Sequence, residues 1–329
     1  MRILFFGDGP WATQSLQQLV EKGWALLGVV VRKNPSDPML LSLAEALDVP
    51  VFQPRNVNTP KFVAQVTALQ PDLNLSVSYD QIVRRALLET APQGFINFHA
   101  GKLPTYRGCN VINWALINGE TELGLTAHYV NEGIDTGDII LQRMLPIGWT
   151  DGYGDLLARV VAAFPDFVAN AVRLIADGQV ERQPQSSLPG IYFSKRQHGD
   201  EWLDWSDSSR NLYNKIRAIT HPGPGARTIL DGEVVIAWRA FYDPAWPTYI
   251  ATPGQVVGCR PNEGVVVKTG DSTLLLQEVQ RLGQEPFVPQ WRMNTRLGIN
   301  LLTYIHSLEA RLARLEKTIA NYPEKDTSG

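Results

Sequence analysis

Residues 96–108 read INFHAGKLPTYRG, and this stretch decides how the first part of the chain is expected to fold. It starts apolar, places an amide and an imidazole two residues apart at Asn97 and His99, and then breaks into a turn with Gly and Pro. Side chains two apart on a strand point to the same side of a sheet, and ligands of open α/β sheets bind at the carboxyl ends of strands. On these two residues alone, a hydrogen-bonded polar strand end is the simpler interpretation.

Strand and helix patterns alternate on both sides of this stretch. The predicted strands are residues 2–6, 24–31, 49–53, 72–78, 94–98 and 122–130, and the predicted helices are residues 40–47, 59–70, 110–119 and 155–178. Alternating strands and helices form right-handed βαβ units around a mostly parallel sheet. We therefore predict a Rossmann-like α/β domain over residues 1–180, with helices on both faces of the sheet. Pro165 is expected to kink or break the last helix.

The composition changes after this domain. Residues 179–190 are polar and contain Pro and Ser, which is typical of a linker. Residues 191–290 hold short β-branched runs separated by Gly and Pro, which predicts a small β-barrel-like domain. Residues 291–329 are predicted to form a C-terminal helix and tail.

The C-terminal helix carries an apolar stripe with coiled-coil character. The stripe consists of Leu308, Leu312, Leu315 and Ile319 in a 4-3-4 spacing, extended backwards by Ile305 and by Leu301 or Leu302. Because this pattern covers about three heptads, we expect a homodimer that uses this helix or the adjacent β-rich region. Packing of the helix on its own β-rich region is the alternative.

The bulk properties are those of an ordinary globular protein. The 329 residues are 44% hydrophobic and 19% charged, with a formal net charge of −3 and a pI of about 6.0. This balance argues against a nucleic-acid partner, which usually requires a basic face. The two cysteines lack metal-ligand spacing, the N-terminus is too short for a signal peptide, and no apolar run approaches the roughly 20 residues of a membrane span. We expect a cytoplasmic protein with no metal and no membrane partner.

Residues 7–12, GDGPWA, fit the G-x-G-x-x-A fingerprint of dinucleotide-binding folds. The next predicted strand ends without the acidic residue that would hold a ribose, although Arg32 and Lys33 would suit the 2′-phosphate of NADP. A tight turn in any α/β fold uses glycine in the same way, and this plain turn is the favoured interpretation.

A second loop strengthens the case for chemistry. Residues 132–138, EGIDTGD, follow another predicted strand and place Asp135 between two glycines. A carboxylate near His99 would favour the imidazolium, and the amide of Asn97 can donate to a developing oxyanion. The alternative is a glycine turn with a solvated acid. The chain has no G-x-S-x-G, H-E-x-x-H or Walker motif, so serine-nucleophile, zinc-peptidase and phosphoryl-transfer chemistry have no support.

Together these residues resemble the folate-dependent formyltransferases. Asn97, His99 and Asp135 look like the Asn-His-Asp triad of that family, and HAGKLPTYRG (99–108) is similar to its H-x-S-L-L-P-x-x-R-G signature. RNLYNKIRAITHPGPGA (210–226) resembles the R-A-x-x-P-x-P-G-A segment of its second domain.

The resemblance implies a reaction and a co-substrate. A primary amine would attack the formyl carbon of N10-formyltetrahydrofolate. His99 would remove the proton of the amine, Asn97 and the imidazolium would hold the tetrahedral oxyanion, and Asp135 would set the orientation and basicity of His99. The implied folate contacts are Gln81, Ile82, Val83, Asn131, Glu132, Gly133, Ile134 and Asp135. Cys109 stands where relatives often have Arg, so the contact made by that Arg is in doubt.

The same resemblance leaves two main acceptors, methionyl-tRNA and the amino sugar of a nucleotide-linked sugar. The quoted motif and HYVNEGIDTGDIILQ (128–142) look more like the sugar enzymes, and the acidic pI points the same way because tRNA binding should need a basic surface. We therefore predict formylation of a nucleotide-linked amino sugar, most simply a dTDP-sugar of lipopolysaccharide biosynthesis, with no nucleic acid as partner. Methionyl-tRNA or another amine is the alternative. A folate- or NADP-binding protein without transferase activity is the third possibility.

Cationic and aromatic side chains supply candidate contacts to such a substrate. A diphosphate would pair with Arg107, Lys195, Arg196 and Arg217, and Tyr106 would offer a flat platform for a base.

Overall fold

The computed structural model describes residues 1–33, 36–185, 191–298 and 301–320. Contacts divide the chain into two units. The first unit combines Met1–Asp200 with Arg217–Pro224, and the second combines Glu201–Ile216 with Gly225–Gly329.

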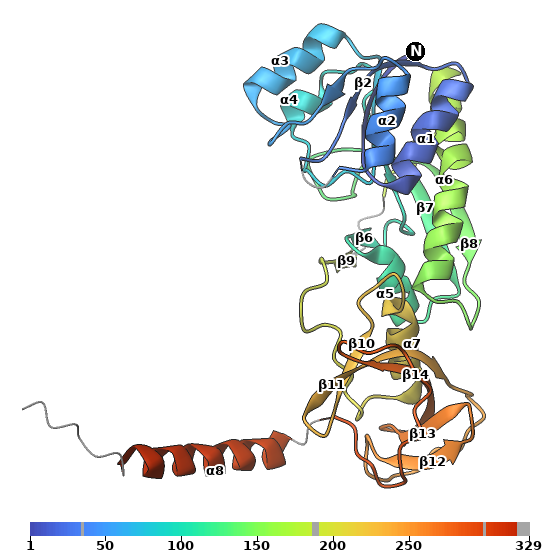
Figure 1. Ribbon diagram of the computed structural model, residues 1–329. Coiled ribbons are helices and arrows are strands. Elements are labelled where there is room, and N and C mark those ends of the chain that lie inside the picture. The colour runs from blue at the N-terminus through green and yellow to red at the C-terminus, as the bar shows by residue number, and fades with distance from the viewer. Residues whose placement is uncertain (34–35, 186–190, 299–300, 321–329) are drawn as a thin grey trace, which may run out of the picture. The chain divides into compact units, whose positions relative to one another are not determined.

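A seven-stranded sheet runs through the first unit in the order β3-β2-β1-β4-β5-β7-β8 (Figure 1). Its strands are β1 (Arg2–Gly7), β2 (Ala25–Val30), β3 (Val51–Phe52), β4 (Leu73–Val77), β5 (Phe95–His99), β7 (Glu122–Tyr129) and β8 (Ile139–Pro146). The five strands from β3 to β5 are parallel, whereas β7 is antiparallel to both β5 and β8. The predicted mostly parallel sheet is confirmed.

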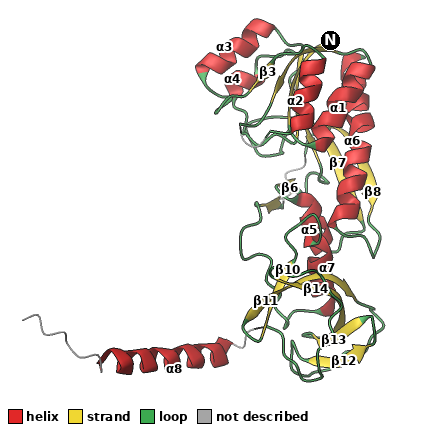
Figure 2. Ribbon diagram, in the orientation of Figure 1, coloured by secondary structure: helices red, strands yellow, loops and turns green. Residues whose placement is uncertain are grey.

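Helices cover both faces of this sheet, as Figures 1 and 2 show. The helices are α1 (Pro10–Glu21), α2 (Pro38–Ala46), α3 (Pro60–Leu69), α4 (Arg85–Leu88), α5 (Val111–Ile117) and α6 (Tyr153–Ala176). α1, α2 and α6 lie on one face, and α3 and α4 lie on the other. The two-sided cover explains why β4 is buried along its whole length and β1 is buried at every residue except Arg2.

The alternation of side chains along β5 decides which face receives the polar groups. Phe98 makes an edge contact with Phe167 of α6, whereas Phe95 belongs to a core cluster on the opposite face with Val83 and Leu87. Because successive side chains alternate, Asn97 and His99 share the face of Phe95.

The expected break at Pro165 is wrong, because α6 continues through this residue. Buried apolar side chains line the helix both before and after the proline, including Phe164 and Val168. One missing backbone hydrogen bond costs about 3 kcal/mol in a helix interior, and burial of several large side chains exceeds this cost.

A small parallel ladder adds a distant segment to the first unit. β6 (Arg107–Gly108) pairs with β9 (Tyr192–Phe193), so residues more than eighty positions apart lie side by side (Figure 1). Gly108 has a φ of 98°, and a Cβ at this position would lie 2.2 Å from the carbonyl oxygen of Phe193. Only glycine therefore permits this ladder without displacement.

The second unit is built on a five-stranded antiparallel sheet in the order β10-β11-β14-β13-β12. Its strands are β10 (Ala226–Leu230), β11 (Glu233–Phe241), β12 (Val256–Arg260), β13 (Gly264–Lys268) and β14 (Thr273–Arg281). The remaining helices are α7 (Ser209–Ile219) and α8 (Leu301–Ala320). The predicted β-rich region followed by a C-terminal helix is confirmed. Within the described residues, neither the 24-residue α6 nor any other helix has the length and apolar character that a membrane crossing requires.

Candidate active site

One strand and one loop bring the three predicted catalytic residues together. Asn97 and His99 lie on β5, and Asp135 lies in the loop between β7 and β8 with a left-handed φ of 53°. The Nδ1 atom of His99 is 3.8 Å from Oδ2 of Asp135, and Nδ2 of Asn97 donates to its Oδ1 at 3.4 Å. The three side chains form one cluster.

Backbone and side-chain donors fix Asp135 in this unusual conformation. The N–H of Gly108 donates to its Oδ2 at 2.8 Å, which ties the carboxylate to β6. Gln185 donates from Nε2 to the carbonyl oxygens of both Asp135 and Gly137, each at 2.8 Å. The guanidinium of Arg107 donates in turn to Oε1 of Gln185 at 2.7 and 3.2 Å. Arg107 therefore supports the loop that carries the carboxylate.

The carbonyl of Tyr106 sets the tautomer of His99. Nε2 of His99 lies 2.6 Å from this oxygen, and a carbonyl only accepts, so Nε2 carries the proton. Nδ1 then holds the lone pair and is the atom that can accept a proton. Gly101 leaves room for this geometry, because a Cβ there would lie 2.4 Å from Nε2 of His99.

Burial and charge act on His99 in opposite directions. Burial lowers the pKa of the imidazole, the charge of Asp135 and the Tyr106 carbonyl raise it, and His128 lowers it again, so that the pKa lies below its usual value of 6.5. The expectation that the carboxylate would favour the imidazolium describes only one of these effects. His99 is thus neutral at physiological pH and available as a base.

The carboxyl group of Asp135 responds to the same surroundings. Burial raises its pKa, but the charge of His99, the nearby imidazole of His128 and a hydrogen bond from the Gly108 N–H hold the pKa well below the usual range. Asp135 is therefore ionised and can stabilise a proton on His99.

His128 is a member of the cluster that the sequence prediction missed. It lies on β7 directly opposite Asn97 and is 2% exposed. Its Nδ1 donates to the carbonyl of Tyr129 at 2.8 Å, which leaves Nε2 to accept from Nδ2 of Asn97 at 3.2 Å. Both N–H groups of the Asn97 side chain are therefore engaged, one with His128 and one with Asp135. Donation to an oxyanion requires that one of them is released, and the hydrogen bond to Asp135 is the longer of the two.

The predicted folate contacts fall on two loops beside the cluster. Val83 is buried in the core cluster against which Val130 also packs, so the segments that contain them converge. The side chain of Gln81 is used internally, since its Oε1 accepts from the N–H of Val57 at 2.9 Å. Ile82 and Ile134 are 66% and 44% exposed and offer apolar surface.

The other predicted folate contacts belong to the loop that ends at Asp135. Oδ1 of Asn131 accepts from the N–H of Gly133 at 3.1 Å and from the hydroxyl of Thr136 at 2.6 Å, so this amide shapes the loop. Glu132 is exposed.

Of the predicted substrate contacts, Arg107 adjoins the cluster through Gln185, and the side chains of Tyr106 and Arg217 are used within the fold. Tyr106 is buried, donates to Glu120 at 2.7 Å and stacks on Phe193. Arg217 is buried as well and donates to the carbonyl oxygens of Gly148 and Asp151.

Lys195 and Arg196 are placed differently from these two residues. Lys195 is exposed, and Arg196 is half-buried. The backbone N–H of Arg196 donates to Oδ1 of Asn110 at 3.0 Å, which anchors the segment that follows β9.

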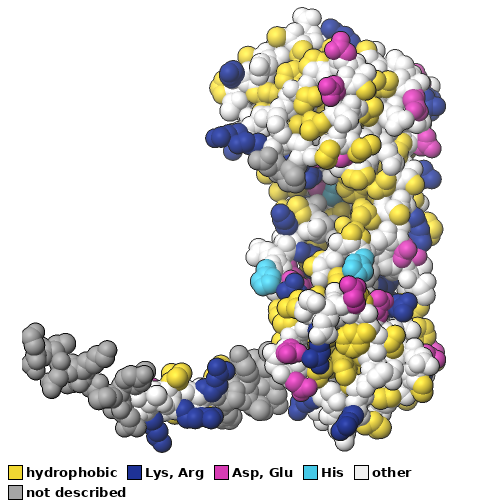
Figure 3. Space-filling model, in the orientation of Figure 1, with side chains coloured by type: hydrophobic (Ala, Val, Ile, Leu, Met, Phe, Trp, Pro, Cys, Tyr) yellow, Lys and Arg dark blue, Asp and Glu magenta, His cyan; other side chains and the backbone are white. Residues whose placement is uncertain are grey.

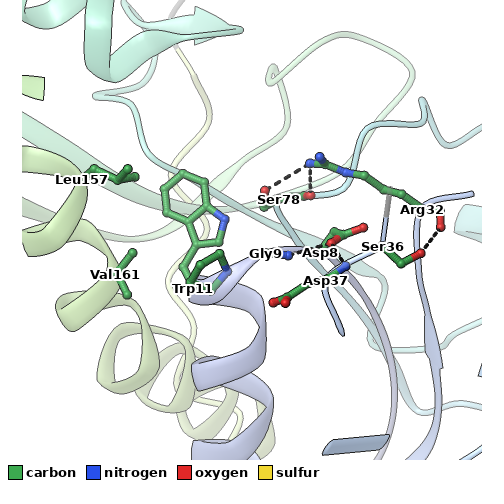
Figure 4. Close-up of a pocket in the computed structure, with 10 residues that line it drawn as sticks. Asp8, Gly9, Trp11, Arg32, Ser36, Asp37, Ser78, Leu157 and Val161 are labelled. Atoms are coloured by element: carbon green, nitrogen blue, oxygen red, sulfur yellow. Dashed lines mark hydrogen bonds between the residues drawn. The ribbon is translucent and has the colours of Figure 1, made fainter. Parts of the chain in front are cut away.

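A pocket of about 420 Å³ opens at the carboxyl ends of β1, β2 and β4 (Figure 4). Its lining residues are Asp8, Gly9, Pro10, Trp11, Arg32, Ser36, Asp37, Ser78, Leu157 and Val161. The indole of Trp11 stands beside Leu157 and Val161, and polar side chains form the opposite wall. Ser78 follows β4, which is the strand next to β5, so the pocket and His99 share one edge of the sheet.

The polar wall has one acceptor that is not satisfied. Oδ1 of Asp8 accepts from the N–H groups of Gly9 and Asp37, each at 2.8 Å. Its Oδ2 has no hydrogen-bond partner among the residues that the structure describes, although Asp8 is only 5% exposed. Arg32, considered above as a partner of a 2′-phosphate, donates to the carbonyl and hydroxyl of Ser78. The polar wall therefore presents an acid where a phosphate-binding loop would present donors.

Comparison with known proteins places the chain in a family. Residues 1–172 match the formyl transferase family, and residues 195–295 match the C-terminal domain of formyl transferases. The chain belongs to the formyltransferase family. It is an N10-formyltetrahydrofolate-dependent formyltransferase.

Curated relatives cover both units of this formyltransferase. The methionyl-tRNA formyltransferase of Symbiobacterium thermophilum is 37% identical over 86% of this chain and 89% of its own length. That of Geobacter sulfurreducens is 33% identical over 91% of this chain and 97% of its own length.

Solved structures share the fold at lower identity. WlaRD, a sugar 3N-formyltransferase crystallised in the presence of dTDP and 5-N-formyl-THF, has a TM-score of 0.65 at 19% identity and covers 87% of this chain and 99% of its own. HypX from Aquifex aeolicus, crystallised with tetrahydrofolic acid, has a TM-score of 0.57 at 18% identity and covers 91% of this chain and 51% of its own.

The predicted amino-sugar acceptor is wrong, and so is the expectation that no nucleic acid takes part. Relatives at 31–37% identity over most of the formyltransferase are named methionyl-tRNA formyltransferase, whereas the solved sugar enzymes are about 20% identical. The motifs on which the expectation rests surround the cluster of Asn97, His99 and Asp135. On the face in Figure 3, Lys and Arg side chains are scattered over the surface. The net charge of a whole chain does not determine what a small patch of its surface binds, so the acidic pI is not evidence against tRNA.

The pH dependence of the formyltransferase tests the assignment of His99 as base. We expect kcat to fall as the pH decreases through the lowered pKa of His99, so the acid limb has its midpoint below 6.5. Asp135→Asn removes a charge that raises this pKa, so the limb should move to lower pH while kcat at pH 7 drops by about 10²-fold. A limb that stays in place or moves upward in Asp135→Asn would contradict the assignment. Initial rates of tetrahydrofolate release provide the measurement.

Gln185 offers a test of how the loop is positioned. Gln185→Ala removes the donors to the carbonyls of Asp135 and Gly137, so the carboxylate loses its fixed place. We expect kcat to fall by about 10-fold to 10²-fold, with a shifted acid limb. Gln183→Ala is the matched control, because Gln183 is exposed and bonds to Ile139 only through its backbone. Equal activity of the two variants would show that Gln185 has no positioning role.

Proposed function

We propose that this formyltransferase transfers the formyl group of N10-formyltetrahydrofolate to the α-amino group of methionine carried on tRNA. The similarity to methionyl-tRNA formyltransferases carries the proposal. It reaches 37% identity, extends through both units, and covers 89% to 97% of the lengths of the two relatives described above. If the similarity covered only the first unit, it would support the use of the folate donor but not the choice of acceptor, because the catalytic cluster lies in that unit.

The catalytic cluster supports a stepwise transfer. Nδ1 of His99 accepts a proton from the amine as the amine nitrogen bonds to the formyl carbon. Asp135 stabilises the imidazolium, and an N–H of Asn97 turns from Asp135 to the oxyanion. The imidazolium then returns the proton to N10 as the bond between N10 and the formyl carbon breaks, which releases tetrahydrofolate and the formylated amine.

The two sides of the cluster suggest separate places for donor and acceptor. We assign the donor to the loops that contain Gln81–Val83 and Asn131–Asp135, where Ile82 and Ile134 can cover the faces of a flat ring. The pocket beside Trp11 is assigned to the acceptor. Methionine has a flexible thioether that packs well against aromatic and branched side chains, as the Trp11 wall offers. Oδ2 of Asp8 would accept from an N–H or O–H of the acceptor.

Formylation of charged tRNA is the direct test. The purified enzyme should formylate methionine on charged initiator tRNA with N10-formyltetrahydrofolate, and mass spectrometry of the released amino acid should show one formyl group in place of one hydrogen. His99→Ala should reduce the rate by about 10²-fold to 10⁴-fold. The comparison arms are free methionine, uncharged tRNA and a nucleotide-linked amino sugar. Activity on any of these without activity on the charged tRNA would refute the proposal.

A reciprocal pair of variants tests the two assigned places. Trp11→Ala should raise the KM for charged tRNA by about tenfold and leave the KM for the donor unchanged, since a lost aromatic contact costs about 1 kcal/mol or more. Ile82→Ala should do the opposite. Because Trp11 also packs on Phe164, thermal unfolding of both variants is measured alongside. The assignment fails if Trp11→Ala affects the donor and Ile82→Ala affects the acceptor.

A further inference from the structure

The C-terminal helix α8 carries a row of exposed apolar side chains. Ile305, Leu308, Leu312 and Leu315 are 48%, 41%, 58% and 60% exposed, and the distances along the chain are three, four and three residues. This spacing places all four on one stripe of the helix, with the period of a coiled-coil seam. Large side chains in such a row are stabilised by a partner that removes them from water.

The described part of α8 does not use its other side chains to bind a neighbouring element. Nε of Arg314 donates to the carbonyl of Ala310 at 3.3 Å, and the hydroxyl of Thr318 donates to the carbonyl of Arg314 at 2.9 Å. Both bonds stay within the helix. The side chains that are described between the seam positions are polar, charged or alanine, and all are exposed.

The identities of the seam residues favour a particular partner. If Ile305 and Leu312 occupy the first position of successive heptads, Leu308 and Leu315 occupy the fourth. A β-branched residue at the first position combined with Leu at the fourth favours two parallel strands. Another helix with the same pattern is present on every copy of the chain.

Charges beside the seam fit the same arrangement. In this register Arg311 precedes a first position and Glu316 follows a fourth position, so they occupy the two flanking sites where interhelical salt bridges form. They are five residues apart, and residues at this spacing are not neighbours on one helix. In a parallel pair without stagger, Arg311 of each helix faces Glu316 of the other, which gives two opposite-charge pairs by symmetry. An antiparallel pair would not join these two residues.

We propose that α8 pairs with α8 of a second copy as a parallel, in-register, two-stranded coiled coil, and that the formyltransferase is thereby a homodimer. The interface is isologous, because the same seam meets itself across a twofold axis. Since the seam is short, the dimer should form at micromolar protein concentrations and dissociate on dilution. The proposal does not depend on the identity of the amine acceptor.

Sedimentation equilibrium of the full chain tests the interface. At tens of micromolar the wild-type mass should approach twice 36.6 kDa. Leu312→Glu places a charge in the seam and should give a monomer. Ala310→Glu is the matched control, because Ala310 lies on the side away from the seam, and it should remain dimeric. A monomeric wild type, or a Leu312→Glu variant that stays dimeric, would overturn the proposal.

Charge reversal tests the parallel register. Arg311→Glu and Glu316→Arg should each raise the dissociation constant by about tenfold, because each creates two like-charge contacts. The double variant should regain the wild-type value. An equimolar mixture of the two single variants should form a heterodimer with wild-type affinity, since every contact is then between opposite charges. Single variants that bind as tightly as the wild type, or a mixture that does not associate, would refute the parallel register.

Discussion

The buried carboxylate of Asp135 is the interaction on which the rest of the active site depends. It contacts the imidazoles of His99 and His128, the amide of Asn97 and the backbone N–H of Gly108. An ion removed from water in this way is stable only when its surroundings are fixed, because desolvation costs several kcal/mol if partners are lost. The loop conformation, the β6–β9 ladder and the Arg107–Gln185 pair supply that fixed environment.

This arrangement suits His99 to two opposing demands that a catalytic base must meet. A histidine that accepts a proton must be neutral before the reaction and stable as a cation during it. Burial keeps His99 neutral, and the adjacent negative charge stabilises the cation when the proton arrives. The Tyr106 carbonyl directs the single proton of the neutral ring to Nε2, so Nδ1 stays available.

Short-range sequence patterns predicted a large part of this molecule. The alternation of strands and helices was sufficient for the parallel sheet, and the two-residue spacing of Asn97 and His99 placed both on one face of β5. His128 and Gln185 could not be found in this way. The place of His128 beside Asn97 follows from the register between β5 and β7. The role of Gln185 follows from its hydrogen bond to the backbone carbonyl of Asp135, fifty residues earlier in the chain. The one signal for His128 in the sequence was its polar side chain in the otherwise largely apolar predicted strand 122–130.

The remaining differences come from properties that residue type and local pattern do not carry. Arg217 and Tyr106 were predicted as contacts to a substrate diphosphate and base, yet both side chains are buried and donate to nearby oxygens, which residue type alone does not reveal. The acceptor was inferred from motifs around the catalytic cluster and from net charge. In the transfer proposed above, the cluster acts on an amine and a formyl carbon whatever the amine belongs to, so its residues say little about the acceptor. Pro165 was judged by local propensity, and tertiary burial along α6 outweighed it.

The antiparallel pairing of β5 with β7 has a consequence for how the enzyme is made. The contacts that join Asn97 and Gly108 to His128 and Asp135 span only 27 to 38 residues of sequence, and the whole cluster lies within residues 97–135. Closing a loop of this length carries a small entropic cost, and chains fold from the N-terminus as they are synthesised. The catalytic groups can therefore meet on the nascent chain before Gln185 has left the ribosome. Gln185 and the β9 residues that pair with β6 are synthesised later, so the contacts that support the Asp135 loop are completed after the cluster itself.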